Sequence, residues 1–281
     1  MSAAHHVWLD EDELEDLSVV RRRPQRHVGG PVVSWDALSH LCGLTQSPIT
    51  QGARPQGSDQ EDEATSIAMS DVDRAQLVPS GWLSTARGLG ERGQELAAGL
   101  GTARTVLSLR AWHRGELRRG WVVVGDEVAV TAYEEDAATS EQAPPGVVTF
   151  DVTPVDALPI VLAKWGGLAP TWNYDTAHEV GDAALVQRRV HDMGTPAPGG
   201  DAALARLWQE DWTLWAVQDE ASGIDLEFLA IGEQGQYVLR ERTDGATVLA
   251  PRPGSLLWGD LQLVLATLSG GSQDGDDGED W

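Results

Sequence analysis

The sequence GVVTFDVTPVDALPIVLAKWGGL, from Gly146 to Leu168, is matched later in the chain by GATVLAPRPGSLLWGDLQLVLATL, from Gly245 to Leu268. Each segment reads as a strand that passes through a threonine-proline or alanine-proline pair into an apolar helix. The same passage from strand to helix, met twice in one chain, indicates that a structural unit has been duplicated.

The elements in front of these two segments repeat as well. TVLSLRAWH (residues 105–113) corresponds to WTLWAVQDE (212–220), and WVVVGDEVAVTAYEED (121–136) corresponds to FLAIGEQGQYVLRERTD (228–244). The helical segments ERGQELAAGL and DAALARLWQE precede the two sets. The turns between the strands are short, and only antiparallel strands can be joined so closely. The sequence therefore predicts a duplicated, pseudo-twofold α+β fold of mainly antiparallel sheet flanked by helices, in which the two half-sheets can join.

The chain is expected to form one compact domain with five parts. These are an N-terminal strand and helix (1–45), a flexible acidic linker (46–70), a first α+β half (71–193), a second α+β half (194–269) and a disordered acidic tail (270–281). Within the first part, VVSWDALSHLCGL predicts a short amphipathic helix with Ser34 as its N-cap. Cys42 is expected on the core side of this helix.

The charge is strongly negative, with 44 acidic residues against 20 basic ones and a formal net charge of −24. Much of the excess lies in three runs, DEDELED (10–16), SDQEDE (58–63) and DGDDGED (274–280), which are interpreted as solvated segments. Such a surface repels a phosphate backbone, so nucleic acid is not expected as a partner. The last run ends too early to supply the twelfth-position glutamate of a calcium-binding loop.

Export, membrane insertion and metal binding also find no support in the sequence. The N-terminus lacks a basic-then-apolar signal layout, and the chain contains no run of about 18 apolar residues. Cys42 is the only cysteine, so no internal disulfide can form, and no cysteine or histidine cluster has zinc spacing. A cytoplasmic protein with no membrane span and no metal is expected.

Several catalytic patterns begin but are incomplete. GLGERG (88–93) spells G-x-G-x-x-G, yet the preceding RAQLVPSGWLSTAR reads as a helix and not as the strand that a dinucleotide site needs. It is interpreted as a turn between two helices with glycines in left-handed caps. HEVGD (178–182) lacks the second histidine of a zinc protease, and Glu134 and Glu135 should point to opposite faces of a strand. No catalytic residue and no cofactor are predicted, so the chain is not expected to be an enzyme.

Tryptophan is abundant, with 12 residues, and two interpretations stay open. Most can fill the core between sheet and helices, or a few can be exposed as interface anchors. WHRGELRRGW (112–121) favours the second, because it places a basic cluster at a hairpin tip between two aromatic residues. A merely solvated hairpin is the alternative. The predicted partner-binding residues are Trp112, His113, Arg114, Arg118, Arg119 and Trp121.

These segments together resemble a known family. VWLDEDELEDL near the N-terminus, RGLGERGQEL leading into VLSLRAW, and the closing GQYVLRERTDGATVLAPRPGSLLWGDLQLVLATL are similar to the EspG family, cytoplasmic chaperones of actinobacterial type VII (ESX) secretion. The resemblance extends from about residue 7 to 268 through diffuse patterns. The use of arginine in place of lysine suits a GC-rich genome, and the acidic linker and tail suggest a divergent member.

The resemblance implies a pseudo-twofold fold and a non-catalytic protein that binds a helical secreted partner of the PE/PPE or WXG type, with no small-molecule substrate. In this family the hairpin between the second and third strands takes part in the contact. If residues 7–10 form the first strand, that hairpin is 112–121. A structural or regulatory scaffold with the same fold is the alternative, and an enzyme of unrecognised type is the third hypothesis.

Overall fold

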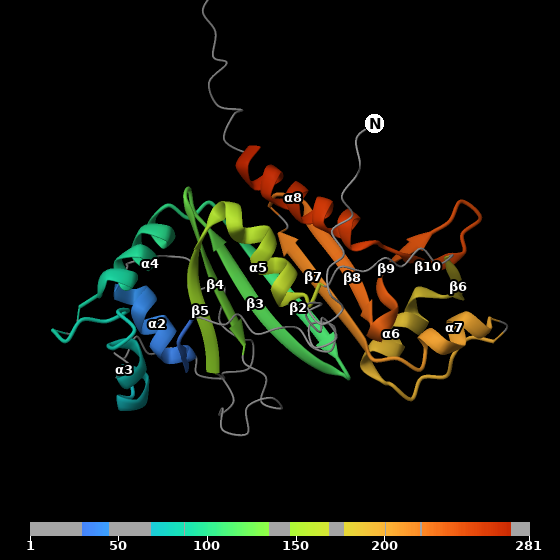
Figure 1. The fold of residues 1–281 in the computed structure, drawn as a ribbon, viewed down its shortest axis with the longest axis horizontal. Helices are drawn as coiled ribbons and strands as arrows, with labels where there is room; N and C mark the ends of the chain where they lie inside the picture. The colour runs from blue at the N-terminus through green and yellow to red at the C-terminus, as the bar shows by residue number, and fades with distance from the viewer. Residues whose placement is uncertain are drawn as a thin grey trace, which may run out of the picture.

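A ten-stranded sheet forms the centre of the protein, seen here in a computed structural model that describes residues 30–44, 69–86, 88–134, 147–168, 177–199, 201–219 and 221–270 (Figure 1). The strands of the first half are β1 (Val32–Ser34), β2 (Thr105–His113), β3 (Glu116–Val124), β4 (Val128–Glu134) and β5 (Val147–Pro154). Those of the second half are β6 (His178–Gly181), β7 (Trp212–Asp219), β8 (Ile224–Ile231), β9 (Gly235–Glu241) and β10 (Thr247–Pro251). Every pairing is antiparallel.

The order of the strands confirms the predicted duplication. Across the sheet it is β1-β5-β4-β3-β2-β7-β8-β9-β10-β6, so β2 and β7 meet at the centre and the two halves extend outward in the same sequence. The outermost strands, β1 and β6, were not predicted. The first four residues of HEVGD form the edge strand β6, and the predicted division at 193/194 separates β6 from the strand β10 with which it pairs.

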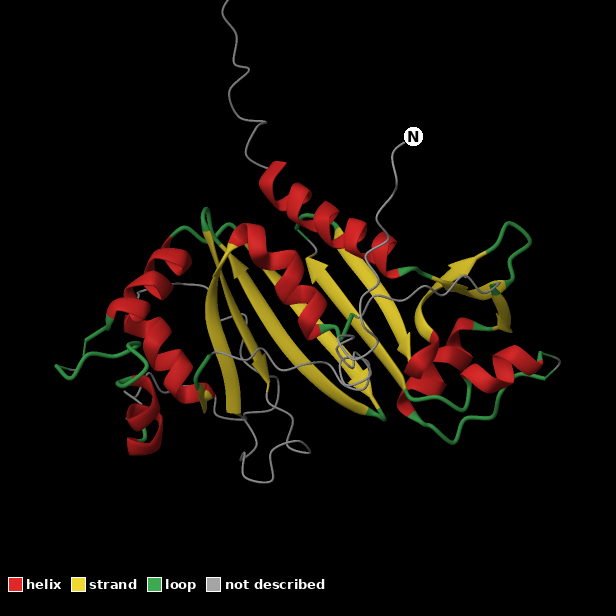
Figure 2. Ribbon diagram, in the orientation of Figure 1, coloured by secondary structure: helices red, strands yellow, loops and turns green. Residues whose placement is uncertain are grey.

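Helices cover both faces of the sheet (Figures 1 and 2). They are α2 (Trp35–Leu44), α3 (Asp71–Leu77), α4 (Glu91–Gly101), α5 (Leu158–Trp165), α6 (Ala183–His191), α7 (Ala202–Leu207) and α8 (Gly254–Gly270), with 3₁₀ turns at η3 (Val155–Ala157) and η4 (Gly232–Gln234). Helices α5 and α8 lie over the middle of the sheet, α2 to α4 at one end, and α6 and α7 at the other (Figure 2).

Strand periodicity divides the buried side chains into three cores. Leu107 and Leu109 of β2 join Trp215 of β7 under α5 and α8, in a core that both halves share. On the opposite face Val106 packs on the first half's own core and Trp112 on that of the second half. Because successive residues of a strand point to opposite faces, one central strand contributes to all three cores.

The N-terminal helix agrees with its prediction. The Ser34 hydroxyl accepts a hydrogen bond from the Ala37 N–H at 3.1 Å and so caps α2, and Cys42 is buried in the core of the first half. Burial raises the pKa of the Cys42 thiol to about 12, so this cysteine is unreactive at neutral pH. The predicted strand at 7–10, nearly all of the predicted linker and all but Gly270 of the predicted tail lie outside the described residues.

GLGERG lies in the connection between two helices, as predicted, but the first helix is shorter than predicted and the glycine caps are not left-handed. Helix α3 ends at Leu77, after which Leu83 pairs with Leu89 in an isolated bridge. Gly90 caps α4 with a φ of −81°, outside the left-handed region. A Cβ on Gly90 would lie 2.2 Å from the Gly81 carbonyl oxygen, and one on Gly93 would lie 2.3 Å from that of Trp82. The glycines are therefore needed because two backbone segments touch.

Asp73 fastens α3 to the first strand. Its carboxylate accepts hydrogen bonds from the N–H of Ser34 at 2.9 Å, from the Ser34 hydroxyl at 2.9 Å and from the Ser70 hydroxyl at 2.6 Å. Burial pushes the pKa of Asp73 upward, but the hydrogen bonds from Ser70 and Ser34 outweigh it and leave the pKa below its usual value. The charged carboxylate is thus favoured in the folded state.

We expect Asp73→Ala to lower the free energy of unfolding by about 2 kcal/mol at pH 7, because the half-buried donors on the two serines lose their acceptor. Asp71→Ala, in the same first turn but exposed, is the control and should change little. Since the folded-state pKa is depressed, the difference between wild type and Asp73→Ala should shrink as the pH falls below the ordinary value of 3.8. Urea unfolding at several pH values measures the loss of stability and its pH dependence. A stability difference that grows in acid would contradict the role of the charged Asp73 carboxylate.

Candidate functional site

The predicted basic hairpin is formed by β2 and β3. The strands pair without a break from Thr105↔Val124 to His113↔Glu116, and Arg114 and Gly115 make the two-residue turn. Their φ angles are 52° and 81°, as tight hairpin turns of type I′ require. Arg114 is the one non-glycine residue with positive φ in the described part of the chain.

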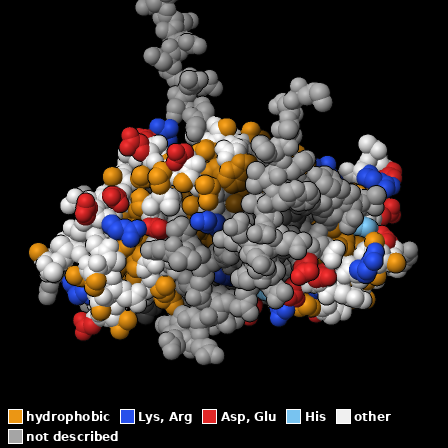
Figure 3. Space-filling model, viewed as in Figure 1, with side chains coloured by type: hydrophobic (Ala, Val, Ile, Leu, Met, Phe, Trp, Pro, Cys, Tyr) orange, Lys and Arg blue, Asp and Glu red, His pale blue; other side chains and the backbone are white. Residues whose placement is uncertain are grey.

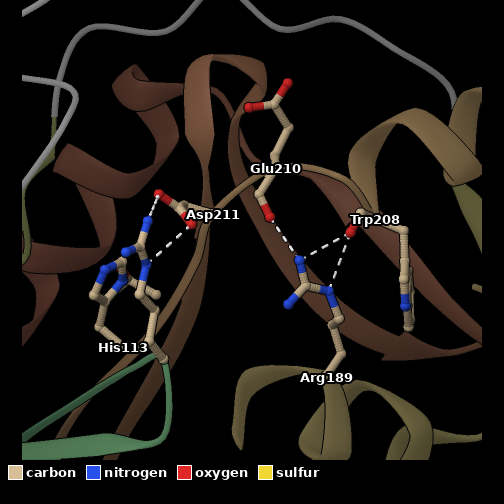
Figure 4. A network of polar contacts seen from close by, with 7 residues as sticks. His113, Arg189, Trp208, Glu210 and Asp211 are labelled. Atoms are coloured by element: carbon tan, nitrogen blue, oxygen red, sulfur yellow. Dashed lines mark hydrogen bonds and ion pairs between the residues drawn. The ribbon is translucent and has the colours of Figure 1, made fainter. Parts of the chain in front are cut away.

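The tip of this hairpin contacts the second half of the chain (Figure 4). Nε and Nη2 of Arg114 donate to the two carboxylate oxygens of Asp211 at 3.2 and 2.7 Å. Nδ1 of His113 lies 3.0 Å from the hydroxyl of Thr213, and the Trp112 ring meets the His191 ring edge-on, with centroids 6.3 Å apart. Arg114, Gly115 and Glu116 at the tip are nevertheless exposed, so the tip is solvated on one side while it contacts the second half on the other.

The surroundings of His113 favour its neutral form. Burial lowers the pKa of the His113 imidazole, and the Arg114 and Arg118 cations lower it further, against the opposing effect of Asp211. A neutral ring can donate to or accept from Thr213 through Nδ1, depending on its tautomer. At neutral pH the His113 ring therefore brings no charge into the contact between the hairpin and the second half.

The structure does not bring the predicted binding residues onto one surface. Because β3 alternates, Arg118 lies on the face that α5 and α8 cover, whereas Arg119 and Trp121 lie on the other. Trp121 packs against Trp35, with ring centroids 5.2 Å apart, and Trp112 contributes to the core of the second half. Which of these residues bind a partner stays a prediction.

The two neighbouring arginines also differ in their partners. The backbone N–H of Arg119 donates to Glu134 at 3.0 Å, and its guanidinium lies 3.6 Å from the same carboxylate. The Glu134 carboxylate is thus engaged by Arg119. Arg118, by contrast, has a buried Nε–H without a hydrogen-bond partner. Of these two arginines, Arg118 is therefore the one that still has an unused hydrogen-bond donor.

Sequence reasoning missed Arg189, which holds the segment that receives the hairpin. Its guanidinium is buried and donates from Nε and Nη2 to the Trp208 carbonyl at 3.1 and 2.8 Å, and from Nη2 to the Glu210 carbonyl at 2.7 Å (Figure 4). It also lies over the Trp212 ring, 5.6 Å from its centroid. In the sequence, QRRVH is typical of a solvated helix end. Arg188 and Arg189 are adjacent and of the same residue type, so the sequence does not show which of them is buried.

Apolar side chains are exposed on the two helices above the shared core. Figure 3 shows hydrophobic atoms gathered over α5 and α8. The exposed members are Ile160 (48%), Leu256 (50%), Trp258 (40%) and Leu263 (65%). Trp82, Trp212 and Trp215 are fully buried and fill the core, as the first interpretation predicts, while an anchoring role for the exposed Trp258 stays a prediction.

The described part of the chain offers neither a metal site nor a membrane-spanning helix. No group of three or more histidine, cysteine, aspartate or glutamate residues in the described ranges is placed to hold a metal ion. No helix in this part of the chain has the length and apolar character needed to cross a membrane.

Comparison with known proteins gives a structural likeness alone. No family model matches the sequence, and no curated protein matches it significantly. Among solved structures, the chain is similar to the Mycobacterium tuberculosis type VII secretion system chaperone EspG5, solved in complex with a PE25–PPE41 dimer. The sequence identity is 15% and the TM-score 0.46, over 85% of this chain and 96% of the EspG5 chain. At these values the likeness decides neither family nor function.

We expect Arg189→Met to lower the free energy of unfolding by about 3 kcal/mol, because the carbonyls of Trp208 and Glu210 lose their donor inside the protein. Arg189→Lys should recover little of this loss, since an ammonium group cannot reproduce the planar fork. Arg188→Met removes the exposed neighbouring arginine and serves as the control. Thermal unfolding measures the effect, and equal stability of the Arg188 and Arg189 variants would show that the buried network is not needed.

Proposed function

We propose that this chain is a non-catalytic cytoplasmic chaperone or adaptor. It binds a helical secreted protein of the PE/PPE or WXG type and keeps it soluble for type VII (ESX) secretion. The observation that carries the proposal is the exposed apolar surface on α5 and α8. The class of client comes from the sequence resemblance to the EspG family.

Helix α8 is apolar on two sides. Leu257, Leu261 and Val264 enter the shared core, while Leu256 and Leu263, seven residues apart, lie on another side and are half or more exposed. Residues at this spacing lie two turns apart along one side of a helix. Exposed apolar residues in such a row suit the apolar flank of another helix, and a chaperone that covers this flank prevents its aggregation.

Charge points to the same face. Arg118 lies on the side of the sheet that α5 and α8 cover, and its side chain is half-buried there. Its guanidinium can pair with a client carboxylate or with the carbonyls at a helix C-terminus. Arg119 is bound to Glu134 on the opposite face and is not needed for this contact.

One observation favours the alternative of a structural or regulatory scaffold with the same fold. At the hairpin tip, contacts within the chain already engage Trp112, His113 and Arg114. A scaffold would keep this contact whether or not a partner is present, whereas a chaperone needs a client.

The client is to be isolated by co-purification with the proteins of neighbouring genes and identified by mass, and its affinity measured by calorimetry. We expect Arg118→Glu to weaken binding at least about tenfold, roughly 1.4 kcal/mol, with little change in thermal stability. Leu263→Glu should weaken binding by a similar factor, because it places a charge in the apolar contact.

Arg119→Glu is the matched control for Arg118→Glu and should have the smaller effect. A larger loss for Arg119→Glu would place the client on the opposite face of the sheet. Full affinity in both the Arg118 and Leu263 variants would exclude the α5 and α8 face. If no helical protein co-purifies, the scaffold becomes the better hypothesis.

A further inference from the structure

The ion pair between Arg114 and Asp211 is well aligned but weakly protected from solvent. The guanidinium meets both carboxylate oxygens, which is the geometry that arginine offers to any carboxylate. The two side chains are 57% and 44% exposed, and pairs as exposed as this contribute little to stability. Another carboxylate can therefore replace Asp211 at Arg114 at small cost.

A second cation lies beside the same aspartate. The Glu210 carbonyl, one residue before Asp211, accepts from Nη2 of Arg189 at 2.7 Å. Arg189 is 1% exposed, makes no ion pair with a described carboxylate within 4.0 Å, and its Nη1 is buried without a hydrogen-bond partner. In Figure 4 this nitrogen points away from the carbonyls of Trp208 and Glu210. Its donor capacity is unused.

We propose that Asp211 is a displaceable internal ligand of Arg114. A carboxylate side chain of a bound partner takes the Arg114 guanidinium, and Asp211 turns to the unpartnered Nη1 of Arg189. The source of that carboxylate rests on the client-binding function proposed above. The exchange between the two arginines is a property of this chain alone.

The local structure favours a turn of the Asp211 side chain over a movement of its backbone. The carbonyls of Trp208 and Glu210 are held by Arg189, and the Trp212 indole N–H donates to the Leu207 carbonyl at 2.8 Å. After the exchange the buried Arg189 cation has a counter-ion and a partner for its free N–H, which offsets the loss of the exposed pair. Asp192, the other acid that acts electrostatically on Arg189, is already hydrogen-bonded to the Gly194 N–H.

The exchange also loosens the hairpin. With Asp211 gone, the tip is still held by the β2–β7 pairing that ends at His113↔Thr213, by the contact of His113 with Thr213, and by the close approach of Gly115, where a Cβ would lie 2.7 Å from the His191 carbonyl oxygen. The partner that fits is thus an acidic side chain presented to the hairpin turn, and its capture removes one of the contacts that hold the tip on the second half.

A client-free experiment tests the exchange. In the full-length chain, Arg114→Ala leaves Asp211 without its first partner, and Asp211→Asn is then introduced into this variant. If Asp211 has moved to Arg189, the added Asp211→Asn should lower Tm by about 2–4 °C. The Arg189 side-chain NMR signal should shift in Arg114→Ala and return when Asp211→Asn is added. An unchanged Tm together with an unmoved Arg189 signal overturns the exchange.

Glu210→Gln is the matched control in both backgrounds. Only the carbonyl of Glu210 contacts Arg189, and its carboxylate points away in Figure 4, so this change should leave Tm and the Arg189 signal unaltered. An effect equal to that of Asp211→Asn would show that the loss of any nearby negative charge suffices, and this too would overturn the assignment to Asp211.

Sodium acetate, titrated against sodium chloride at equal ionic strength, supplies a competing carboxylate. The Arg114 side-chain signal should respond at an acetate concentration roughly threefold or more lower in Asp211→Asn than in wild type, because the internal competitor is gone. Equal responses, or none in either protein, would contradict displacement. None of these measurements uses a client. A negative result would therefore overturn the exchange without affecting the client-binding proposal. If the client-binding proposal fails, these measurements still test the exchange.

Discussion

Six residue pairs, from Ser108↔Gln218 to His113↔Thr213, join β2 to β7 and make one sheet out of two repeats. Without its partner, each half would have β2 or β7 as an exposed edge strand. It would also expose the apolar side chains that it contributes to the shared core. The core under α5 and α8 exists only because Leu107 and Trp215 come from neighbouring strands of different halves. The burial of this shared core fixes the arrangement of the two repeats relative to each other.

The same junction places the candidate site. The β2 strand that forms the seam ends in the hairpin turn, so Arg114 necessarily reaches the loop that precedes β7, where Asp211 lies. A contact between residues nearly a hundred positions apart follows from the register of two strands. The hairpin tip therefore lies next to the junction between the two halves. A partner that binds the tip also contacts this junction.

The repeat made most of the fold predictable, because the order of strands and helices is written twice in the sequence. Strands β1 and β6 were not predicted, because a segment of three or four residues is too short to show an alternation of apolar and polar residues. The separation of Arg118 from Arg119 onto opposite faces does follow from the period of a strand, although the predicted site grouped them. The roles of Asp211 and Arg189 could not be predicted, since both depend on tertiary contacts that local pattern does not encode.

The short outer strands have a consequence for how the protein behaves at high concentration. A sheet this wide would ordinarily offer two long rows of unpaired backbone groups, along which further molecules could add. Here it ends in strands of three and four residues, and on one side Asp73 already occupies the N–H of Ser34. The short edge strands thus offer few backbone groups for the lateral addition of further molecules.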